Sequence, residues 1–345
     1  MTKIKDIAKQ AGVSTATVSH VLNNTGRVGE STRQKVLEVI NELNYKPNKI
    51  AKSLKIKKTS TVGVIAEDVT VFNTPDIIDG INEIAENSGL GILLSNLRIY
   101  KKMGIDFSQK EHMKELLSIA FDEMVKNQVD GIIYIGTYTR DVTDVIPANI
   151  PLPVVYTYCY TSNELDYTVN YDDEFAAYEA TRHLIDSGHK EIALISGIID
   201  SIPSHERFNG YRRALMDYGI PLNPSFVKTG DWEVDSGFIL TEELLNLAKK
   251  PTAILALNDL MAFGSINAAK NRGLHVPDDI SIIGFDNREF SAFTTPGITT
   301  MSIPLHQMGE KSMDMLKLLI ANRNIDKKKI KLHCDLLKRE SVSKK

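Results

Sequence analysis

Short polar side chains gather on one face of a candidate helix near the N-terminus. Thr15, Ala16 and Thr17 follow Ser14, and His20 comes one turn later. An α-helix enters the major groove of B-DNA only when its contacting side chains are short enough for the backbone to approach the base edges. The chemistry that this stretch could perform is therefore recognition of DNA.

Two short helices would position this face. The apolar residues of the first recur at i, i+3, i+4 and i+7, namely Ile4, Ile7, Ala8 and Ala11. Gly12 then stands where the helix must stop and the chain must turn, and Ser14 is a good N-cap for a second helix. Two helices joined by such a turn are typical of a DNA-binding helix-turn-helix. The alternative is an ordinary αα-hairpin whose exposed face binds nothing.

A third helix would close a small core. Ser31 and Gln34 have the spacing of a capping box. The inner face of this helix is predicted to consist of Val36, Leu37, Ile40 and Leu43. Pro47 ends the segment, because the residue before a proline is disfavoured in the helical region.

The net charge of −3 conceals an asymmetry along the chain. Residues 1 to 60 contain 12 Lys and Arg against 4 Asp and Glu, a balance of +8, whereas the remainder contains 29 against 40, a balance of −11. Basic segments bind the phosphate backbone. A basic N-terminal part followed by an acidic remainder indicates a protein that contacts nucleic acid at one end only.

Residues 48 to 58 form a short basic segment with helical spacing. A helix of about eight residues is marginal in water, because nucleation costs more than so few hydrogen bonds return. It should order only against a second subunit or against DNA, with Lys52 and Lys55 on phosphates and Leu54 inserted between base steps from the minor groove. The alternative is a solvated, flexible linker.

Beyond residue 60 the pattern changes to buried strands that alternate with amphipathic helices. The predicted strands are Val62 to Ala66, Gly91 to Ser95, Gly131 to Ile135, Val154 to Tyr156, Ile192 to Ser196, Ala253 to Leu257 and Ile280 to Phe285. This alternation predicts an α/β fold with parallel sheets covered on both faces. Seven strands over this length favour two similar subdomains, with ligands beyond the carboxyl ends of the strands.

Composition and cysteine usage narrow the class further. With 42% hydrophobic and 25% charged residues, the chain reads as a globular protein. No apolar run could span a membrane, and Lys3, Asp6 and Lys9 interrupt the apolar core that a secretory signal needs. We therefore expect a cytoplasmic protein with no membrane partner. Cys159 and Cys334 lie far apart, which indicates neither a disulfide framework nor a zinc site.

An enzyme is the first alternative for such a chain. Neither a Gly-x-Gly-x-x-Gly nor a Gly-x-x-x-x-Gly-Lys-Ser/Thr motif occurs. The histidines, among them His183, His189, His205 and His306, have no neighbours at the spacing of a metal site or a catalytic triad. We expect no catalysis, no cofactor and no metal. A secreted sugar-binding receptor is the second alternative, but it would need an export signal and would not carry a basic head.

At this point the chain resembles, from end to end, the lactose-repressor/galactose-repressor (LacI/GalR) family of transcription regulators. The resemblance rests on ordered motifs: Ile4 to Ala8, Ala11 to Ser14, Thr17 to Ser19, Asn44 to Asn48, Ala51 to Leu54, Gly188 to Ile192, Arg207 to Tyr211, Asn258 to Ala262 and Ser281 to Asp286. So many matches in order are far more specific than a lone helix-turn-helix.

The resemblance implies a homodimer whose two heads bind a near-palindromic operator. It places Thr15, Ala16 and His20 at base-reading positions, and Ser14, Thr17, Ser19 and Asn23 at phosphate-holding positions. Paired hinge helices would lie in the minor groove, with Leu54 opening the central base step and Ala51 beside it. The implied domains are a head at 1–46, a hinge at 47–59 and an effector-binding body at 60–345. In the body, one subdomain covers about 60–172 and 302–330, and the other about 173–301 and 331–345.

The body is further similar to periplasmic sugar-binding proteins, which hold a ligand between two lobes. A sugar needs bidentate acceptors and donors and an apolar platform for its C–H face. The residues expected to supply them are Phe72, Asn73, Arg207, Trp232, Asn258 and Asp286. The structural alternatives are that Trp232 is simply packed, that Asp286 caps a helix and that Arg207 pairs with an acid. A purine or another metabolite remains an alternative effector.

Three features depart from the family pattern. The loop from Arg98 to His112 is longer than usual, and Leu332-His333-Cys334 replaces the family's Leu-Pro before a predicted final strand, Leu332 to Leu337. The family's C-terminal tetramerisation helix is absent, which favours a dimer. We expect effector binding to move the lobes and so to form or melt the hinge helices, with a coupling of about 1 to 3 kcal/mol per site.

Overall fold

The computed structural model describes residues 3–22, 25–45, 59–104 and 109–345. The chain divides into two compact units, residues 1–59, called the head, and residues 60–345, called the body. The predictions made for Asn23, Ala51, Leu54 and Lys55, and for the hinge helix, lie outside the described residues.

The head contains the predicted helix-turn-helix. Helix α1 (Ile4–Ala11) ends at Gly12, whose φ of 66° lies in the left-handed region that glycine adopts at low cost. Helix α2 (Thr15–Leu22) begins with the backbone N–H of Thr17 donating to Ser14 Oγ at 3.0 Å, so the predicted N-cap is confirmed. Helix α3 (Glu30–Glu42) completes the core around Ile7, Val18 and Val36.

Two expectations for the third helix are wrong. The helix begins at Glu30 after Gly29, with no side-chain cap, so Ser31 lies inside the first turn and cannot form a capping box with Gln34. The predicted Val36, Ile40 and Leu43 do pack in the core, together with Val39, but the fourth predicted residue, Leu37, is 44% exposed. Which side chains face the core depends on where the helix begins and on what it packs against. The sequence pattern predicted neither correctly.

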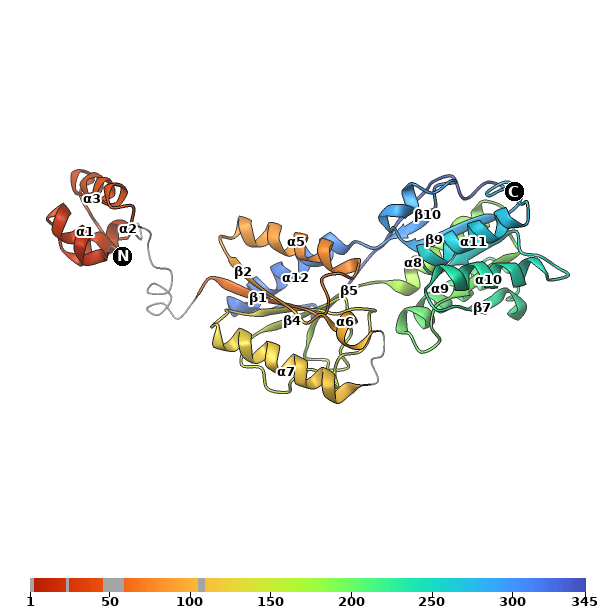
Figure 1. Cartoon of the computed structure of the whole chain (residues 1–345), viewed down its shortest axis with the longest axis horizontal. Coiled ribbons are helices and arrows are strands. Elements are labelled where there is room, and N and C mark those ends of the chain that lie inside the picture. Colours follow the sequence, from red (N-terminus) through yellow and green to blue (C-terminus); the bar gives the residue numbers. More distant parts are fainter. Residues whose placement is uncertain (1–2, 23–24, 46–58, 105–108) are drawn as a thin grey trace. The chain divides into compact units, whose positions relative to one another are not determined.

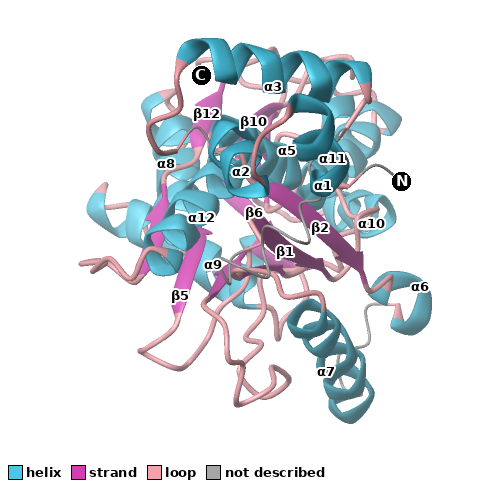
Figure 2. Ribbon diagram, turned by 90° about the vertical axis from the view of Figure 1, so that its left-hand side faces the viewer, coloured by secondary structure: helices cyan, strands magenta, loops and turns pink. Residues whose placement is uncertain are grey.

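The body consists of two six-stranded sheets, each flanked by helices (Figures 1 and 2). The first sheet has the order β11-β5-β4-β3-β1-β2 and the second β12-β10-β9-β8-β6-β7. Paired strands are parallel, except that β12 is antiparallel to β10. The strands are β1 (Thr61–Ala66), β2 (Gly91–Asn96), β3 (Ile132–Ile135), β4 (Val154–Thr157), β5 (Tyr167–Tyr171), β6 (Ile192–Ser196), β7 (Val227–Thr229), β8 (Ala253–Ala256), β9 (Ser281–Asp286), β10 (Thr299–Ser302), β11 (Lys329–Leu332) and β12 (Asp335–Leu337).

The predicted fold class is confirmed, and all seven predicted strands are present. The lobe built on the first sheet is called the N-lobe and the other the C-lobe. The N-lobe carries α5 (Asn73–Asn87), α6 (Ile99–Met103), α7 (Lys110–Lys126) and α12 (Leu305–Ile320), and the C-lobe carries α8 (Asp173–Asp186), α9 (Ile202–Asp217), α10 (Val234–Leu245) and α11 (Asp259–Asn271). Short 3-10 helices lie at Pro224–Phe226 and Glu289–Ala292. None of the helices in the described ranges is both long and apolar enough to cross a membrane.

The chain passes between the lobes at three places. It leaves β5 for α8, leaves β10 for α12, and leaves β11 for β12. The last passage corrects the predicted single strand from Leu332 to Leu337. Two strands occupy this stretch and belong to different sheets, with His333 and Cys334 between them. The local sequence does not show that the two halves of this stretch pair with strands of different sheets.

The segment from Arg98 to His112 is only partly a loop. Helix α6 follows Arg98 directly, buries Ile99 and Met103 against the N-lobe, and is followed by α7 from Lys110. This extra helix places Tyr100 on the wall of the cavity described next.

Candidate functional site

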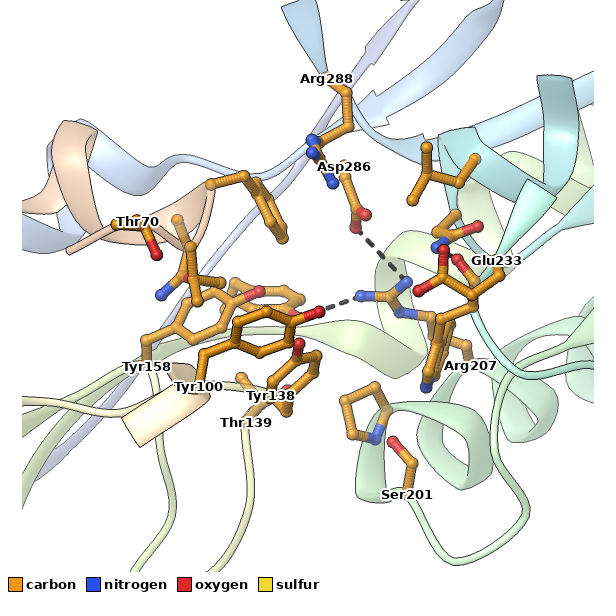
Figure 3. A pocket seen from close by; sticks show the side chains of 18 residues that line it. Thr70, Tyr100, Tyr138, Thr139, Tyr158, Ser201, Arg207, Glu233, Asp286 and Arg288 are labelled. Carbon is orange, nitrogen blue, oxygen red and sulfur yellow. Dashed lines mark hydrogen bonds and ion pairs between the residues drawn. The ribbon is translucent and has the colours of Figure 1, made fainter. Parts of the chain in front are cut away.

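A cavity of about 260 Å³ lies between the two lobes, beyond the carboxyl ends of their strands (Figure 3). Its lining residues are Thr70, Val71, Phe72, Asn73, Tyr100, Tyr138, Thr139, Tyr158, Tyr171, Ser201, Pro203, Arg207, Trp232, Glu233, Asn258, Leu260, Asp286 and Arg288. In doubly wound α/β folds ligands bind at this edge of the sheets. All six residues predicted from the sequence to contact an effector line this one cavity.

Arg207 is the most firmly held charged group of the cavity. It projects from α9 with only 4% of its side chain exposed, and its Nε donates to Asp173 Oδ1 at 2.6 Å. One terminal nitrogen donates to the backbone oxygen of Leu257, and the other to the hydroxyl of Tyr171 at 3.0 Å. The guanidinium also lies 3.6 Å from the ring centroid of Phe285. Arg207 therefore joins elements of both lobes.

Asp286 is an acceptor beside this arginine. Its Oδ1 lies 3.7 Å from Arg207 Nη1, longer than a hydrogen bond, and the side chain is 9% exposed. Burial raises the pKa of this carboxyl to about 8, although Arg207 opposes the shift. Burial likewise raises the pKa of the carboxyl of Asp259, the first residue of α11, to about 6. Asp286 caps no helix, so it keeps acceptor capacity toward the cavity.

Trp232, the only tryptophan of the chain, is packed and lines the cavity at the same time. Its indole lies against the backbone of Gly197, where an added Cβ would come within 2.0 Å of the ring. The Arg207 guanidinium is 5.8 Å from the ring centroid. The glycine therefore fixes the plane of the indole.

Asn258 also has a structural role. Its Oδ1 accepts from the backbone N–H of Met261 at 2.8 Å and so caps α11, while its Nδ2 donates to the backbone oxygen of Trp232 at 2.8 Å. Both polar ends are already engaged. The residue therefore orders the loop that carries Trp232.

The predicted N-lobe residues lie where β1 leads into α5. The ring of Phe72 lies 4.6 Å from the guanidinium of Arg288, a residue of the C-lobe. Asn73 is fully buried, and its Nδ2 donates to the backbone oxygen of Gly136 at 3.3 Å. Phe72 can therefore take part in stacking, while the amide of Asn73 braces the neighbouring strand end.

The backbone around the cavity is strained. Of the eleven non-glycine residues with positive φ in the described ranges, five line the cavity, namely Tyr138, Thr139, Tyr158, Trp232 and Asp286. Such conformations cost about 1 to 3 kcal/mol each and cluster at functional sites. Asp286, with a φ of 103°, is the most extreme of the five.

Sequence reasoning missed Tyr100, Tyr138, Glu233 and Arg288 on the cavity wall. Tyr138 lies three residues beyond the end of β3, so its place after a strand could have identified it. Glu233 and Arg288 are sequence neighbours of Trp232 and Asp286, close enough to have been named with them. Tyr100 gave no signal, because its position depends on the unexpected helix α6.

In the head, the side chains predicted to contact DNA lie on and before α2. Thr15, Ala16 and His20 are exposed. The His20 ring lies against Gly26, with Nδ1 at 3.3 Å from the Thr25 hydroxyl, which fixes its direction. The hydroxyl groups of Ser14 and Thr17 are hydrogen-bonded, with their oxygens 2.9 Å apart, and Ser19 is half-buried. The exposed set forms the short-side-chain face that a groove requires.

A helix-turn-helix head followed by a two-lobed body with an interlobe cavity defines the class of ligand-binding transcription regulators. Two family models match the chain: that of bacterial regulatory proteins of the lacI family over residues 3–48, and that of the periplasmic binding protein-like domain over residues 181–342. These matches cover the head and most of the C-lobe.

Full-length relatives extend the match to the whole chain. Catabolite control protein A of Priestia megaterium is 39% identical over 331 residues, covering 95% of this chain and 96% of the relative. The HTH-type transcriptional repressor PurR of Vibrio campbellii is 33% identical, covering 100% and 99%. The lac repressor dimer bound to operator and the anti-inducer ONPF is 30% identical, with a TM-score of 0.80 over 99% of both chains. The chain belongs to the LacI family, and it is a DNA-binding transcription repressor.

Proposed function

We propose that this repressor responds to a small polyhydroxylated effector of the carbohydrate class, bound in the interlobe cavity. The observation that carries the proposal is the pairing of a buried acceptor, Asp286, with a fixed donor, Arg207, in a cavity that Phe72 and Trp232 also line. A ring that presents hydroxyls at its edge and C–H groups on its face satisfies both kinds of group.

The size of the cavity favours a small ligand. Ligand sites range from about 300 to 1,000 Å³, and this cavity, at about 260 Å³, lies just below that range. A solved relative supports the carbohydrate class: the transcriptional regulator CelR in complex with cellobiose is 26% identical, with a TM-score of 0.66 over 99% of this chain.

The ligand class can be tested by fluorescence, because Trp232 is the only tryptophan and lines the cavity. The purified full chain is titrated with panels of sugars, sugar phosphates and purines while Trp232 emission is recorded. Saturable quenching or a spectral shift by one sugar, lost in Asp286→Asn, is expected. Saturation by a purine and by none of the sugars would contradict the carbohydrate assignment and favour a purine effector.

For the head we propose that Thr15, Ala16 and His20 read base edges, and that Ser14, Thr17, Ser19, Asn23 and Lys55 hold phosphates. Two copies would bind a near-palindromic operator as a homodimer, with Leu54 and Ala51 in the minor groove. Support comes from the exposed face of α2 and from the operator-bound lac repressor dimer.

A gel shift on the promoter region of the protein's own gene tests this reading. Salt-sensitive, sequence-selective retardation is expected, since each phosphate contact releases a counterion. His20→Ala should weaken specific binding more than non-specific binding, whereas Lys55→Ala should weaken both equally. An unchanged operator preference in His20→Ala would exclude base reading by this residue.

We also propose that effector binding is coupled to the segment that contains Leu54. Leu54→Ala is expected to lower operator affinity and to reduce the response to the effector. If operator affinity and effector response both stayed at the wild-type level, this account of the coupling would be wrong.

A further inference from the structure

A group of metal-binding side chains lies outside the effector cavity, on the surface of the N-lobe where α5 and α12 pack together (Figure 1). Helix α5 contributes Asp79 and Glu83, and α12 contributes His306 and Glu310. Each pair has i, i+4 spacing, which places both members on the same helical face one turn apart. The two pairs face each other across the contact between the helices.

Two glycines bring these faces together. A Cβ at Gly80 would come within 2.0 Å of the backbone oxygen of His306, and one at Gly309 within 2.1 Å of the backbone oxygen of Ile77. The helices therefore touch backbone to backbone at the level of the cluster. This close approach brings side chains of moderate length from both helices to a common point.

Two of the distances match those between neighbouring ligand atoms of a coordination shell. His306 Nε2 lies 3.4 Å from Asp79 Oδ2 and 3.4 Å from Glu83 Oε2. The ligand atoms of Glu83, His306 and Glu310 all lie within 4.8 Å of one another. In a tetrahedral site with metal–ligand distances of about 2.0 to 2.2 Å, neighbouring ligand atoms are about 3.3 to 3.6 Å apart. Charge-assisted hydrogen bonds would be shorter, at about 2.7 to 2.9 Å.

The charge balance also favours a cation. Three carboxylates surround one imidazole, and among the described residues the only basic side chain in an ion pair with Asp79 or Glu83 is His306 itself. An imidazole nitrogen among carboxylates suits a divalent transition metal better than Mg²⁺ or Ca²⁺, which prefer oxygen ligands.

We propose that Glu83, His306 and Glu310, with Asp79 beside His306, form a binding site for a divalent transition-metal ion of the Zn²⁺ type. The ion would join α5, whose first residue lines the effector cavity, to α12, which follows the second passage between the lobes. The site is independent of the proposed effector and of its chemical class.

Calorimetric titration of the full chain, freed of any affinity tag, with ZnCl₂ tests the proposal. Wild type should bind one equivalent per chain, and His306→Asn and Glu310→Gln should each weaken binding by about tenfold or more. His275→Asn is the matched control, since His275 also lies 3.4 Å from a carboxylate, that of Asp279, but belongs to no such cluster among the described residues.

Thermal unfolding in the presence of EDTA checks that the variants are folded, because all four proteins should then unfold at closely similar temperatures. Added Zn²⁺ should raise the unfolding temperature of wild type and His275→Asn more than that of the two cluster variants. Absence of stoichiometric binding to wild type, or equal binding by His306→Asn and wild type, would overturn the proposal.

Discussion

The two walls of the effector cavity differ in how their polar groups are held. On the C-lobe wall, Arg207 makes three hydrogen bonds, and both the oxygen and the nitrogen of the Asn258 amide are hydrogen-bonded to the backbone. The N-lobe wall consists mainly of aromatic rings and hydroxyls, including Phe72, Tyr100 and Tyr138. The C-lobe wall is a pre-organised charged network, and the N-lobe wall is a set of stacking surfaces.

This difference has energetic consequences. Removing a member of a buried charged network leaves its partners uncompensated, whereas trimming a partly exposed hydroxyl leaves few groups unsatisfied. Substitutions on the C-lobe wall should therefore affect folding and binding together. Substitutions of partly exposed side chains on the N-lobe wall, such as Tyr100, should affect binding alone.

The largest effect is expected for Arg207→Ala. It leaves the carboxylates of Asp173 and Asp286 buried without their cation and should lower the free energy of unfolding by about 3 to 5 kcal/mol, measured by urea denaturation. Arg213→Ala, which breaks the half-exposed pair with Glu174, is the control and should cost at most about 1 kcal/mol. Equal losses in the two variants would remove the distinction between a network and a surface pair.

Asp286→Asn should weaken effector binding by about ten- to hundredfold, because hydrogen bonds to a charged group contribute about 1.5 to 3 kcal/mol. The wild-type pKa of about 8 lies above the ordinary value of 3.8, so the ionised acceptor forms as the pH rises through 8. Wild-type affinity should therefore increase from pH 6 to pH 9, and that of the variant should not. A parallel pH profile in both proteins would exclude Asp286 as the titrating acceptor.

The same residue gives a prediction for stability. Because the folded pKa is raised, the contribution of Asp286 is fully present below about pH 4 and is lost as the pH rises through 8. Denaturation of wild type between pH 5 and pH 9 should show a steeper decline than that of Asp286→Asn. The pKa of Asp259 is also raised, but Asp259 is present in both proteins and so does not account for a difference between them. An identical decline would contradict this reading.

Gly197→Ala should displace the Trp232 indole, because the new methyl group would lie 2.0 Å from ring atoms. Overpacking of this kind costs about 1 to 3 kcal/mol, and the emission spectrum of Trp232 should shift in the free protein. Gly29→Ala in the head is the control, because a Cβ at Gly29 would meet no neighbour within 4 Å. An unshifted spectrum in Gly197→Ala would show that the plane of the indole is not fixed by this contact.

The smallest effect is expected for Tyr100→Phe on the N-lobe wall. Tyr100 is 55% exposed, so loss of the hydroxyl should leave the free energy of unfolding unchanged. If the hydroxyl contacts the effector, affinity should fall by about 0.5 to 1.5 kcal/mol, measured by Trp232 fluorescence. A lower free energy of unfolding in this variant would show that the N-lobe wall contributes to stability as the C-lobe wall does.

The sequence predicted β1 to β4 of the first sheet and β6, β8 and β9 of the second, because each is a short, mainly apolar run such as Ile192 to Ser196. It did not predict β5, β7, β10 and β11, where polar residues such as Asn170, Lys228 and Thr300 obscure the pattern, and it joined β12 to Leu332 as one strand. Their strand character comes from tertiary pairing, which outweighs local propensity. The prediction therefore fails where a strand contains several polar residues, whether the strand lies inside a sheet or at its edge.

For the cavity, residues directly after strands could be predicted and residues brought in by other elements could not. Asp286 ends β9, so its position follows from the strand pattern. Tyr100 depends on α6, whose amide N–H at Tyr100 donates to Asp68 Oδ2 at 3.0 Å, a contact across 32 residues. The engagement of Asn258 as a helix cap was likewise hidden, because composition does not show which partner an amide takes.

The last two strands bear on how the body is completed during synthesis. Because β11 closes one edge of the first sheet and β12 one edge of the second, both sheets lack a strand until residues 329 to 337 have left the ribosome. Neither lobe is a continuous stretch of chain, so neither can finish folding ahead of the other. A nascent chain arrested before this point would expose two unpaired β-edges at once, which makes the final stage of translation the one most exposed to aggregation.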